Sequence, residues 1–452
     1  MGLTGQLSFW DASAYHQGRL GDSVDWWAFW TFEGTPGRDA VDAHLESRLP
    51  SLAAMRRRIV ELPGHVDRPY WVTDATPLSE LVTHIDAESM DWTTCMDTVG
   101  KMLAAPLDSR KTAWKLYVFH GVTGCPHTAG PATFVAGHIS HTMMTGSAFP
   151  SMTKALFADG EEVLVDGLPE ARSKALSPLS ALARSVAAPF KLVPFSVRLA
   201  KTKRTAPPAT AGAAEVAQTY QAPTYDLPPG GGDRTLRFIE IPTNQLRGSS
   251  TTVTVGALTA VSKAMQTFAE RESGEPMTQV LSNVVVAVPD ADHMGVNRLG
   301  YSMLNLRGDL EDLKARSAEI AASLATARDR IADPARAAAD VVQGRVPFLL
   351  YRMASAIGRK RTLAAVRPYD ERLYTALTSL VVSPAGCAVA GAPMTMLSVY
   401  QGGSMGLTHS TCGSKESVTI ATVAQRGVIS DIDQYAADLQ AAAVEVGKAL
   451  NS

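Results

Sequence analysis

Two imidazole side chains stand at the end of an apolar stretch of this sequence. They lie in the segment GHISHTMMTG, residues 137–146, within residues 116–153, where no side chain carries a formal charge. Histidine is the side chain best suited to move protons near neutral pH. We therefore consider His141 as a general base, with His138, Ser140, Thr145 and Gly146 as the residues around it. The alternative is that these histidines are hydrogen-bonded core residues.

The elements that must position this segment can be read from the residues before it. Residues 132–136, ATFVA, are short and apolar between turn residues, which predicts a buried strand that leads into the histidine loop. Residues 114–120 predict a second strand. Residues 95–105 have the apolar spacing of a helix, which the following Pro-Leu-Asp ends.

Composition narrows the class of protein. Charged residues make up 19% of the 452 residues and the formal net charge is -2, so nothing favours a nucleic-acid partner. The four cysteines, Cys95, Cys125, Cys387 and Cys412, are scattered without a CxxC pair. That pattern predicts reduced thiols and no metal site, as in a cytoplasmic protein. The start of the chain has no secretory signal pattern. The uncharged residues 373–414 are broken by Pro and Gly, which predicts buried strands and not a membrane span.

A change of composition divides the chain. Residues 205–233 are rich in Ala, Pro, Thr and Gly, which is typical of a linker. We therefore predict an N-terminal lobe at residues 1–190 with the histidine segment, a crossover at 191–235, and a C-terminal lobe at 236–452. The C-terminal half predicts strands at 235–241, 280–288 and 418–424. It also predicts helices at 254–271, within 310–342 and at 432–450. Both halves mix the two, which favours an α/β or α+β class.

Two further segments show helical or amphipathic patterns. Residues 38–62 carry apolar side chains every three or four positions and predict a mostly helical segment, interrupted at Pro50. Its run of three arginines, residues 56–58, is expected on the solvated face. Residues 182–204 alternate apolar and basic side chains. That pattern fits either a membrane interface or a lobe-packing segment with a solvated basic end.

Several short motifs follow one another in a recognisable order. They are LSFWD at residues 7–11, PLDSR at 106–110, APT at 222–224, and the final strand and turn at 419–433. In order and spacing, the chain resembles the bacterial bifunctional wax ester synthases/acyl-CoA:diacylglycerol acyltransferases, within the condensation-domain acyltransferase superfamily. The resemblance implies an α/β fold of two CoA-dependent-acyltransferase-like lobes. These form a pseudo-dimer of mixed-sheet sandwiches with a channel between them.

The family signature HHxxxDG is only partly kept. The second His, which is the catalytic base in the family, and the Gly match His141 and Gly146. Ser140 replaces the first His and Thr145 replaces the Asp. The family's "ND" pair falls at about Thr254-Val255, and its "SNVPGP" stretch resembles residues 379–384 without the Asn.

The resemblance implies an acyl-CoA-dependent O-acyltransferase with His141 as base. The acceptor would be a diacylglycerol, a long-chain alcohol or another hydroxyl-bearing metabolite. No metal or cofactor is implied, since acyl-CoA is a substrate. The protein is expected in the cytoplasm, with peripheral membrane or lipid-droplet contact left open, as is its oligomeric state. Two alternatives stand beside this hypothesis. One is a non-catalytic relative that binds a lipid or a partner, favoured by the lost polar positions. The other is a biosynthetic acyltransferase that uses a carrier-protein thioester or an amine acceptor.

Overall fold

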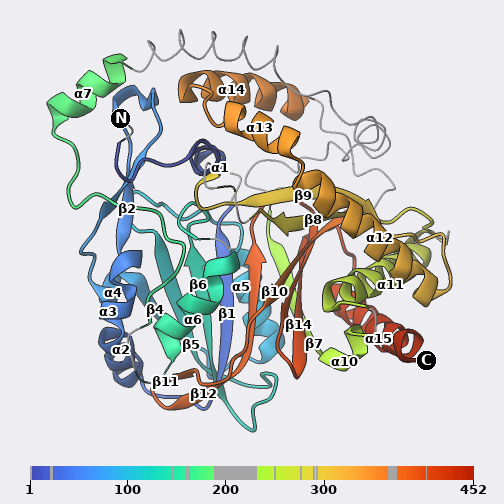
Figure 1. Ribbon diagram of the computed structural model, residues 1–452. Helices are drawn as coiled ribbons and strands as arrows, with labels where there is room; N and C mark the ends of the chain where they lie inside the picture. The colour runs from blue at the N-terminus through green and yellow to red at the C-terminus, as the bar shows by residue number, and fades with distance from the viewer. Residues whose placement is uncertain are drawn as a thin grey trace.

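The strands form two large mixed sheets. The computed structural model describes residues 3–20, 24–144, 146–158, 160, 163–187, 232–248, 251–274, 277–288, 291, 294–364, 374–403 and 405–452. One six-stranded sheet has the order β11-β12-β1-β6-β5-β4 and the other the order β7-β14-β13-β10-β8-β9, with a small β2-β3 pair beside the first (Figure 1). The strands are β1 (Trp26–Glu33), β2 (Arg57–Val60), β3 (Tyr70–Thr73), β4 (Val82–Asp86), β5 (Trp114–Val122), β6 (Ala132–Ile139), β7 (Arg234–Pro242), β8 (Leu281–Ala287), β9 (Leu299–Asn305), β10 (Tyr374–Val381), β11 (Ala388–Val389), β12 (Ala392–Gln401), β13 (Leu407–Gly413) and β14 (Ser417–Gln425).

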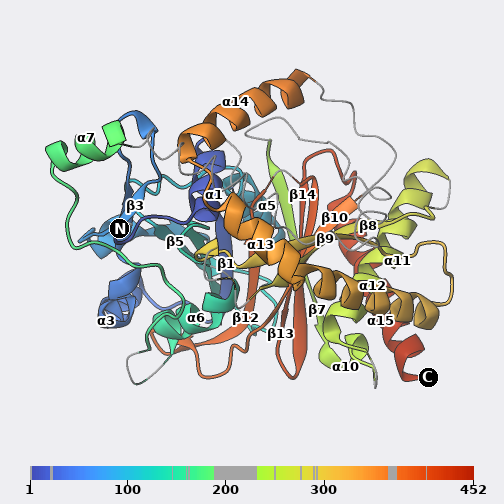
Figure 2. The same cartoon turned by 45° about the horizontal axis from the view of Figure 1, so that its top comes forward.

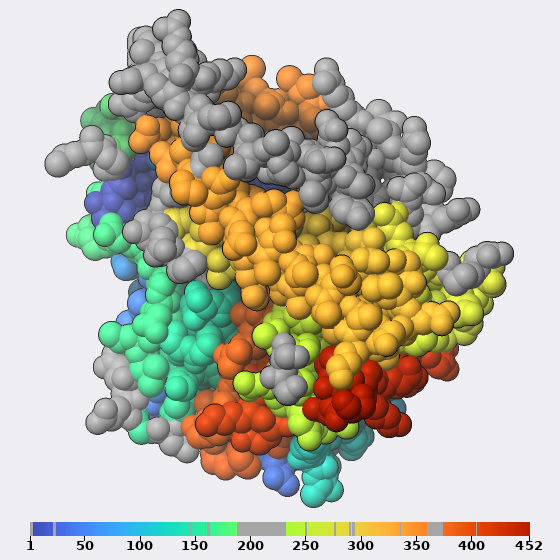
Figure 3. Space-filling model, turned by 45° about the vertical axis from the view of Figure 1, so that its right-hand side comes forward, coloured from blue at the N-terminus to red at the C-terminus, as the bar shows by residue number. Residues whose placement is uncertain are grey.

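Helices cover the two sheets. Those in the first half are α1 (Phe9–Arg19), α2 (Arg38–Ser47), α3 (Leu49–Leu52), α4 (Leu78–Leu81), α5 (Trp92–Met102), α6 (Phe149–Phe157) and α7 (Pro178–Ala187), with short 3₁₀ turns η1 (Ala53–Met55), η2 (Pro63–His65) and η3 (Gly146–Ala148). Those in the second half are α10 (Thr243–Leu246), α11 (Val253–Ser273), α12 (Leu313–Ile331), α13 (Pro334–Gln343), α14 (Phe348–Ala364) and α15 (Ile432–Asn451). In Figure 3, α12 (gold) and α15 (red) lie together on one face of the molecule.

The mixed α/β class is confirmed, and the two sheets have separate cores. One apolar cluster lies around β1, β6 and α6, and another lies between the second sheet and helices α11, α12 and α15. A third cluster joins the two halves through α5, which packs against β7. A Cβ on Gly100 of α5 would lie 2.3 Å from the carbonyl oxygen of Arg234, so this contact needs glycine.

The chain crosses between the sheets late in the sequence. β12 pairs antiparallel with β1, so a strand from the second half belongs to the first sheet. The predicted division at residues 191–235 stays a prediction, because residues 188–231 lie outside the described part of the chain. The same gap contains most of the amphipathic segment at 182–204 and the APT motif at 222–224.

The prediction for residues 38–62 was partly wrong. The segment is helical only to Met55, and Arg57–Val60 is strand β2, which pairs with β3. Ile59 has helical spacing from Met55 but is buried in this pair. Arg57 is not on a solvated face either, since its guanidinium is largely buried and donates to the carbonyl oxygens of Ala54 and Pro169. The other helices and strands predicted above are found within a few residues of their predicted limits.

Candidate functional site

His141 lies two residues beyond the end of β6, where it contacts residues from the second half of the chain. β6 is buried along its whole length, as its apolar sequence predicted, and lies between β1 and β5. The register aligns Ile139 with Trp26 of β1, and Trp26 with Gln401 of β12. The first residue of β1 therefore lies beside the last residues of β6 and β12. This brings the side chain of Gln401 to His141, with 3.0 Å between Nε2 of the amide and Nε2 of the ring.

The ring of His141 is neutral at pH 7. His141 is 5% exposed, and burial lowers its pKa to about 4, although the backbone of Met144 and the charge of Asp25 favour the protonated ring. An amide NH₂ group can only donate, so Nε2 of His141 accepts from Gln401 and the ring carries its proton on Nδ1. Nδ1 is buried and makes no hydrogen bond of normal geometry with the described residues. The lone pair of Nε2 is thus occupied by the Gln401 amide in this structure.

Two cavities meet at His141. The larger, of about 410 Å³, is lined by α1, by the segment from Met294 to Tyr301, by α13 and by Gln401. The smaller, of about 280 Å³, is lined by the other side of α1, by residues 106–110 and by residues 140–142. Ala14, Val24 and His141 line both. His141 therefore lines both cavities and can be reached from two sides.

A second chain of contacts fixes the backbone of the histidine loop from the C-terminal half. Asn297, in the connection between β8 and β9, donates from Nδ2 to the carbonyl oxygen of His141 at 2.8 Å. The same amide nitrogen lies 2.9 Å from Oδ1 of Asp11 in α1. Asp11 Oδ2 also accepts from the backbone N–H of Val296 at 3.1 Å. α1 thus holds the β8–β9 connection, which in turn holds His141.

Asp11 is deeply buried at this junction. Burial raises the pKa of Asp11, while hydrogen bonds from Val296, Ser8 and Asn297 oppose the shift. Ser8 Oγ also donates to the carbonyl oxygen of Met294 at 2.7 Å. Gly295 makes this close approach possible: its φ is +81°, and a Cβ there would lie 2.1 Å from Asp11 Oδ2. The LSFWD segment is therefore a support for the site.

Ser140 and His138 have supporting positions. The Ser140 hydroxyl is 2.9 Å from Ser109 Oγ and 2.8 Å from Thr142 Oγ1, so it ties the histidine loop to the PLDSR segment. His138 points to the other face of β6, where its ring stacks on Trp27 with centroids 4.1 Å apart and its Nε2 lies 3.1 Å from Asp25 Oδ2. His138 lines neither of the two cavities described above.

The end of the motif touches the second sheet. A Cβ on Gly146 would lie 2.7 Å from Cδ2 of Leu380 in β10, so the loop and β10 pack closely here. Thr145 lies outside the described residues. Thr254 lies at the position that resembles the "ND" pair, and Ser379 begins the stretch that resembles "SNVPGP". Their hydroxyls are hydrogen-bonded at 3.0 Å, which joins α11 to β10.

The sequence did not identify three residues of the site as functional. Asn297 and Gln401 are 156 and 260 residues from His141 along the chain, and neither lies in a motif. Asp25, which holds His138 and accepts from the backbone N–H of Leu107 at 2.7 Å, also had no signal. Asp11 was visible only as the last residue of the LSFWD motif.

Comparison with known proteins confirms the expected fold. No family model and no curated protein sequence matches the chain. Among solved structures, the wax ester synthase/diacylglycerol acyltransferase from Marinobacter aquaeolei VT8 matches with a TM-score of 0.59 at 13% identity, covering 98% of both chains. The first condensation domain of the calcium-dependent antibiotic synthetase matches with a TM-score of 0.55 at 10% identity, covering 100% of this chain and 97% of that domain. The starter condensation domain of rhizomide synthetase, in complex with C8-CoA and Leu-SNAC, matches with a TM-score of 0.52 at 13% identity, covering 99% of this chain and 94% of that domain. The chain thus has the two-lobe fold that these proteins share.

Proposed function

We propose that this protein is an acyltransferase that moves a fatty acyl group from a CoA thioester to a hydroxyl acceptor, with His141 as general base. The observation that carries the proposal is a buried, neutral imidazole in the common wall of two cavities. Such a site lets a donor and an acceptor approach one base from two sides. The shared fold supports it, since one neighbour is a wax ester synthase/diacylglycerol acyltransferase and another was solved with C8-CoA.

The chemistry needs one proton carrier. The acceptor hydroxyl would replace the Gln401 amide at Nε2 of His141 and give its proton to that nitrogen as the oxygen attacks the thioester carbonyl carbon. The C–S bond then breaks, and the imidazolium returns the proton to the leaving thiolate. An ester and free CoA result, with all protons accounted for. The pKa of about 4 keeps the base unprotonated at pH 7, and the charge of Asp25 favours the transient imidazolium.

The test is product formation by the purified protein. Octanoyl-CoA and palmitoyl-CoA are each offered with a long-chain alcohol, a diacylglycerol and an amine. Ester, amide and free CoA are then measured by mass spectrometry. We expect ester formation that falls at least about 10²-fold in His141→Ala, the usual contribution of a general base. His127→Ala is the matched control, since His127 is an exposed histidine between β5 and β6 that lines neither cavity.

A specific observation keeps a second function in view. Gln401 already satisfies Nε2 of His141, as it would in a protein that binds a lipid and does not transform it. That candidate predicts binding of acyl-CoA or lipid without turnover, and equal binding by His141→Ala. Amide formation in place of ester, or turnover only with a carrier-protein thioester, would instead favour the biosynthetic alternative.

A further inference from the structure

Exposed apolar side chains are concentrated on two helices. In the described part of the chain, nine large apolar side chains are exposed, and six of them lie on α7 and α14. On α7 they are Leu179, Leu182 and Val186, with exposed fractions of 81%, 53% and 63%, and on α14 they are Leu350, Met353 and Ile357, with 37%, 55% and 55%. Both sets have the spacing i, i+3, i+7. Each set therefore forms one stripe along its helix.

The sequence around both stripes is strongly basic. Residues 171–214, which include α7, contain eight Lys or Arg and no Asp or Glu. Residues 341–368, which include α14, contain six Lys or Arg and again no Asp or Glu. The whole chain is nearly neutral, with a net charge of -2, so this charge is a local feature. Apolar stripes within basic segments are the pattern by which helices lie on anionic lipid surfaces.

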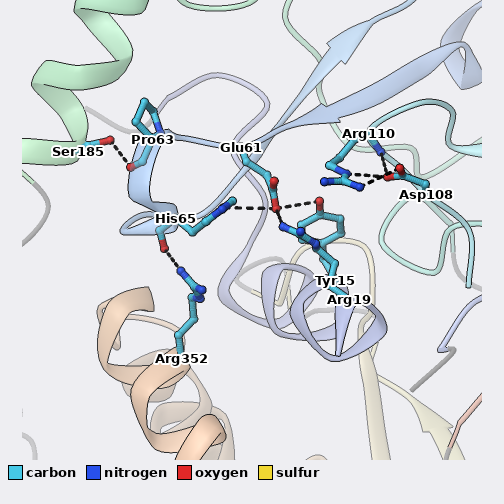
Figure 4. Close-up of polar contacts among 9 residues, drawn as sticks. All are labelled: Tyr15, Arg19, Glu61, Pro63, His65, Asp108, Arg110, Ser185 and Arg352. Carbon is cyan, nitrogen blue, oxygen red and sulfur yellow. Dashed lines mark hydrogen bonds and ion pairs between the residues drawn. The ribbon is translucent and has the colours of Figure 1, made fainter. Parts of the chain in front are cut away.

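One turn anchors both helices, and α7 and α14 lie at the same end of the molecule (Figures 1 and 2). Figure 4 shows the turn η2 between them. The hydroxyl of Ser185 on α7 donates to the carbonyl oxygen of Pro63 at 2.9 Å, and the guanidinium of Arg352 on α14 donates to the carbonyl oxygen of His65 at 2.7 Å. The base of this turn is fixed to α1, because Glu61 accepts from Tyr15 at 3.0 Å and also pairs with Arg19.

The inner side of α14 is already occupied. Tyr351 packs edge-on against Phe9 of α1 with ring centroids 5.3 Å apart, and Phe348 packs against His16 at 6.1 Å. Tyr351 also lines the larger cavity beside His141. The exposed stripe of α14 thus lies on the side of the helix that does not pack against α1. The packed side includes Tyr351, which lines the larger cavity.

We propose that the stripes of α7 and α14 form a docking surface for an anionic lipid bilayer. The six apolar side chains insert among the acyl chains at the interface, and the basic composition of both segments favours an anionic surface over a neutral one. This orientation places α14, and the larger cavity behind it, against the membrane. The inference concerns binding alone and does not depend on the acyltransferase proposal.

Vesicle flotation with the full chain tests the surface. The vesicles are phosphatidylcholine alone or phosphatidylcholine with phosphatidylglycerol. We expect the protein to bind the anionic vesicles more tightly than the neutral ones. Replacement of Leu179, Leu182 and Val186 by Ser, or of Leu350, Met353 and Ile357 by Ser, should each weaken partitioning at least about tenfold. The matched control replaces the exposed Leu164 and Val381, which belong to neither helix, by Ser.

The proposal is overturned if either triple variant binds anionic vesicles as tightly as the unmodified protein. It is supported if both triple variants lose binding, the control keeps it, and circular dichroism shows that all variants are folded. It is overturned if the protein floats with neither kind of vesicle, if it does not distinguish them, or if the control loses binding equally. It is also overturned if the unmodified protein is a dimer that the α14 substitutions dissociate while no vesicle is bound, since a second copy would then be the occupant.

Discussion

Replacing Gln401 by Glu should raise the pKa of His141, because it places a carboxylate beside a buried imidazole. The amide of Gln401 is now 3.0 Å from Nε2 of the ring. Unit charges about 3 Å apart attract by about 5 kcal/mol at an effective dielectric constant of about 20, before the cost of burying the carboxylate is subtracted. Opposite charges at such distances usually shift a pKa by about 1–3 units, so the pKa of His141 should rise from about 4 to between about 5 and 7.

The assay is a pH titration by NMR with histidine labelled at Cε1. The spectrum of His141→Ala assigns the signal. Gln401→Leu is the control, because it removes the hydrogen bond and adds no charge, so the pKa of His141 should rise by less than it does in Gln401→Glu. If ester formation is also observed, the acid limb of kcat/KM should move to higher pH by the same number of units in Gln401→Glu. A pKa of His141 that is unchanged in Gln401→Glu would falsify the contact on which the site is built.

Two further predictions concern stability. Burial lowers the pKa of His141 to about 4 and that of His409 to about 3, from about 6.5 in the unfolded chain. Unfolding therefore takes up protons below pH 6.5, and stability falls as the pH falls. Urea denaturation should show a loss of about 2 kcal/mol per histidine between pH 7 and pH 5, and His409→Asn should remove about half of this pH dependence. Gly295→Ala should cost about 2–4 kcal/mol, since it combines a positive φ of +81° with a clash against Asp11. Gly130→Ala, at a loop position with open space, should be near neutral in the same measurement, and equal effects of the two substitutions would contradict the argument.

The long helices were predicted correctly because their capping residues and apolar spacing lie within the helix itself. The helix predicted at residues 432–450 is α15, Ile432–Asn451, and the one predicted at 254–271 is α11, Val253–Ser273. Both are amphipathic segments with a capping Asp or Thr, so propensity, capping and burial agree. The prediction for residues 57–60 was wrong because local and tertiary signals disagree there. Their apolar spacing fits a helix, but pairing with β3, which depends on tertiary structure, makes them a strand.

The site itself could be predicted only in part. The motif and the preceding apolar strand placed His141 at the end of β6, and the structure places it there. Asn297 and Gln401 could not be found, because their positions depend on chain crossings that no local pattern encodes. Gln401 reaches the ring only because β12 enters the first sheet in register with β1. Asn297 reaches the loop only because Asp11 holds the β8–β9 connection against α1.

His141 is held in place by contacts that do not involve the signature residues that HHxxxDG has at the altered positions. Ser140 stands at the position of the first histidine of the signature and holds its loop through two hydroxyl contacts, to Ser109 and Thr142. From the other side, the amide of Asn297 holds the carbonyl oxygen of His141. These are hydrogen bonds between neutral groups, which satisfy buried polar atoms without the desolvation cost of a buried ion pair. Ser140 and Asn297 therefore hold His141 as a buried imidazole whose pKa is lowered to about 4, and under the proposed function an acceptor hydroxyl would have to displace Gln401.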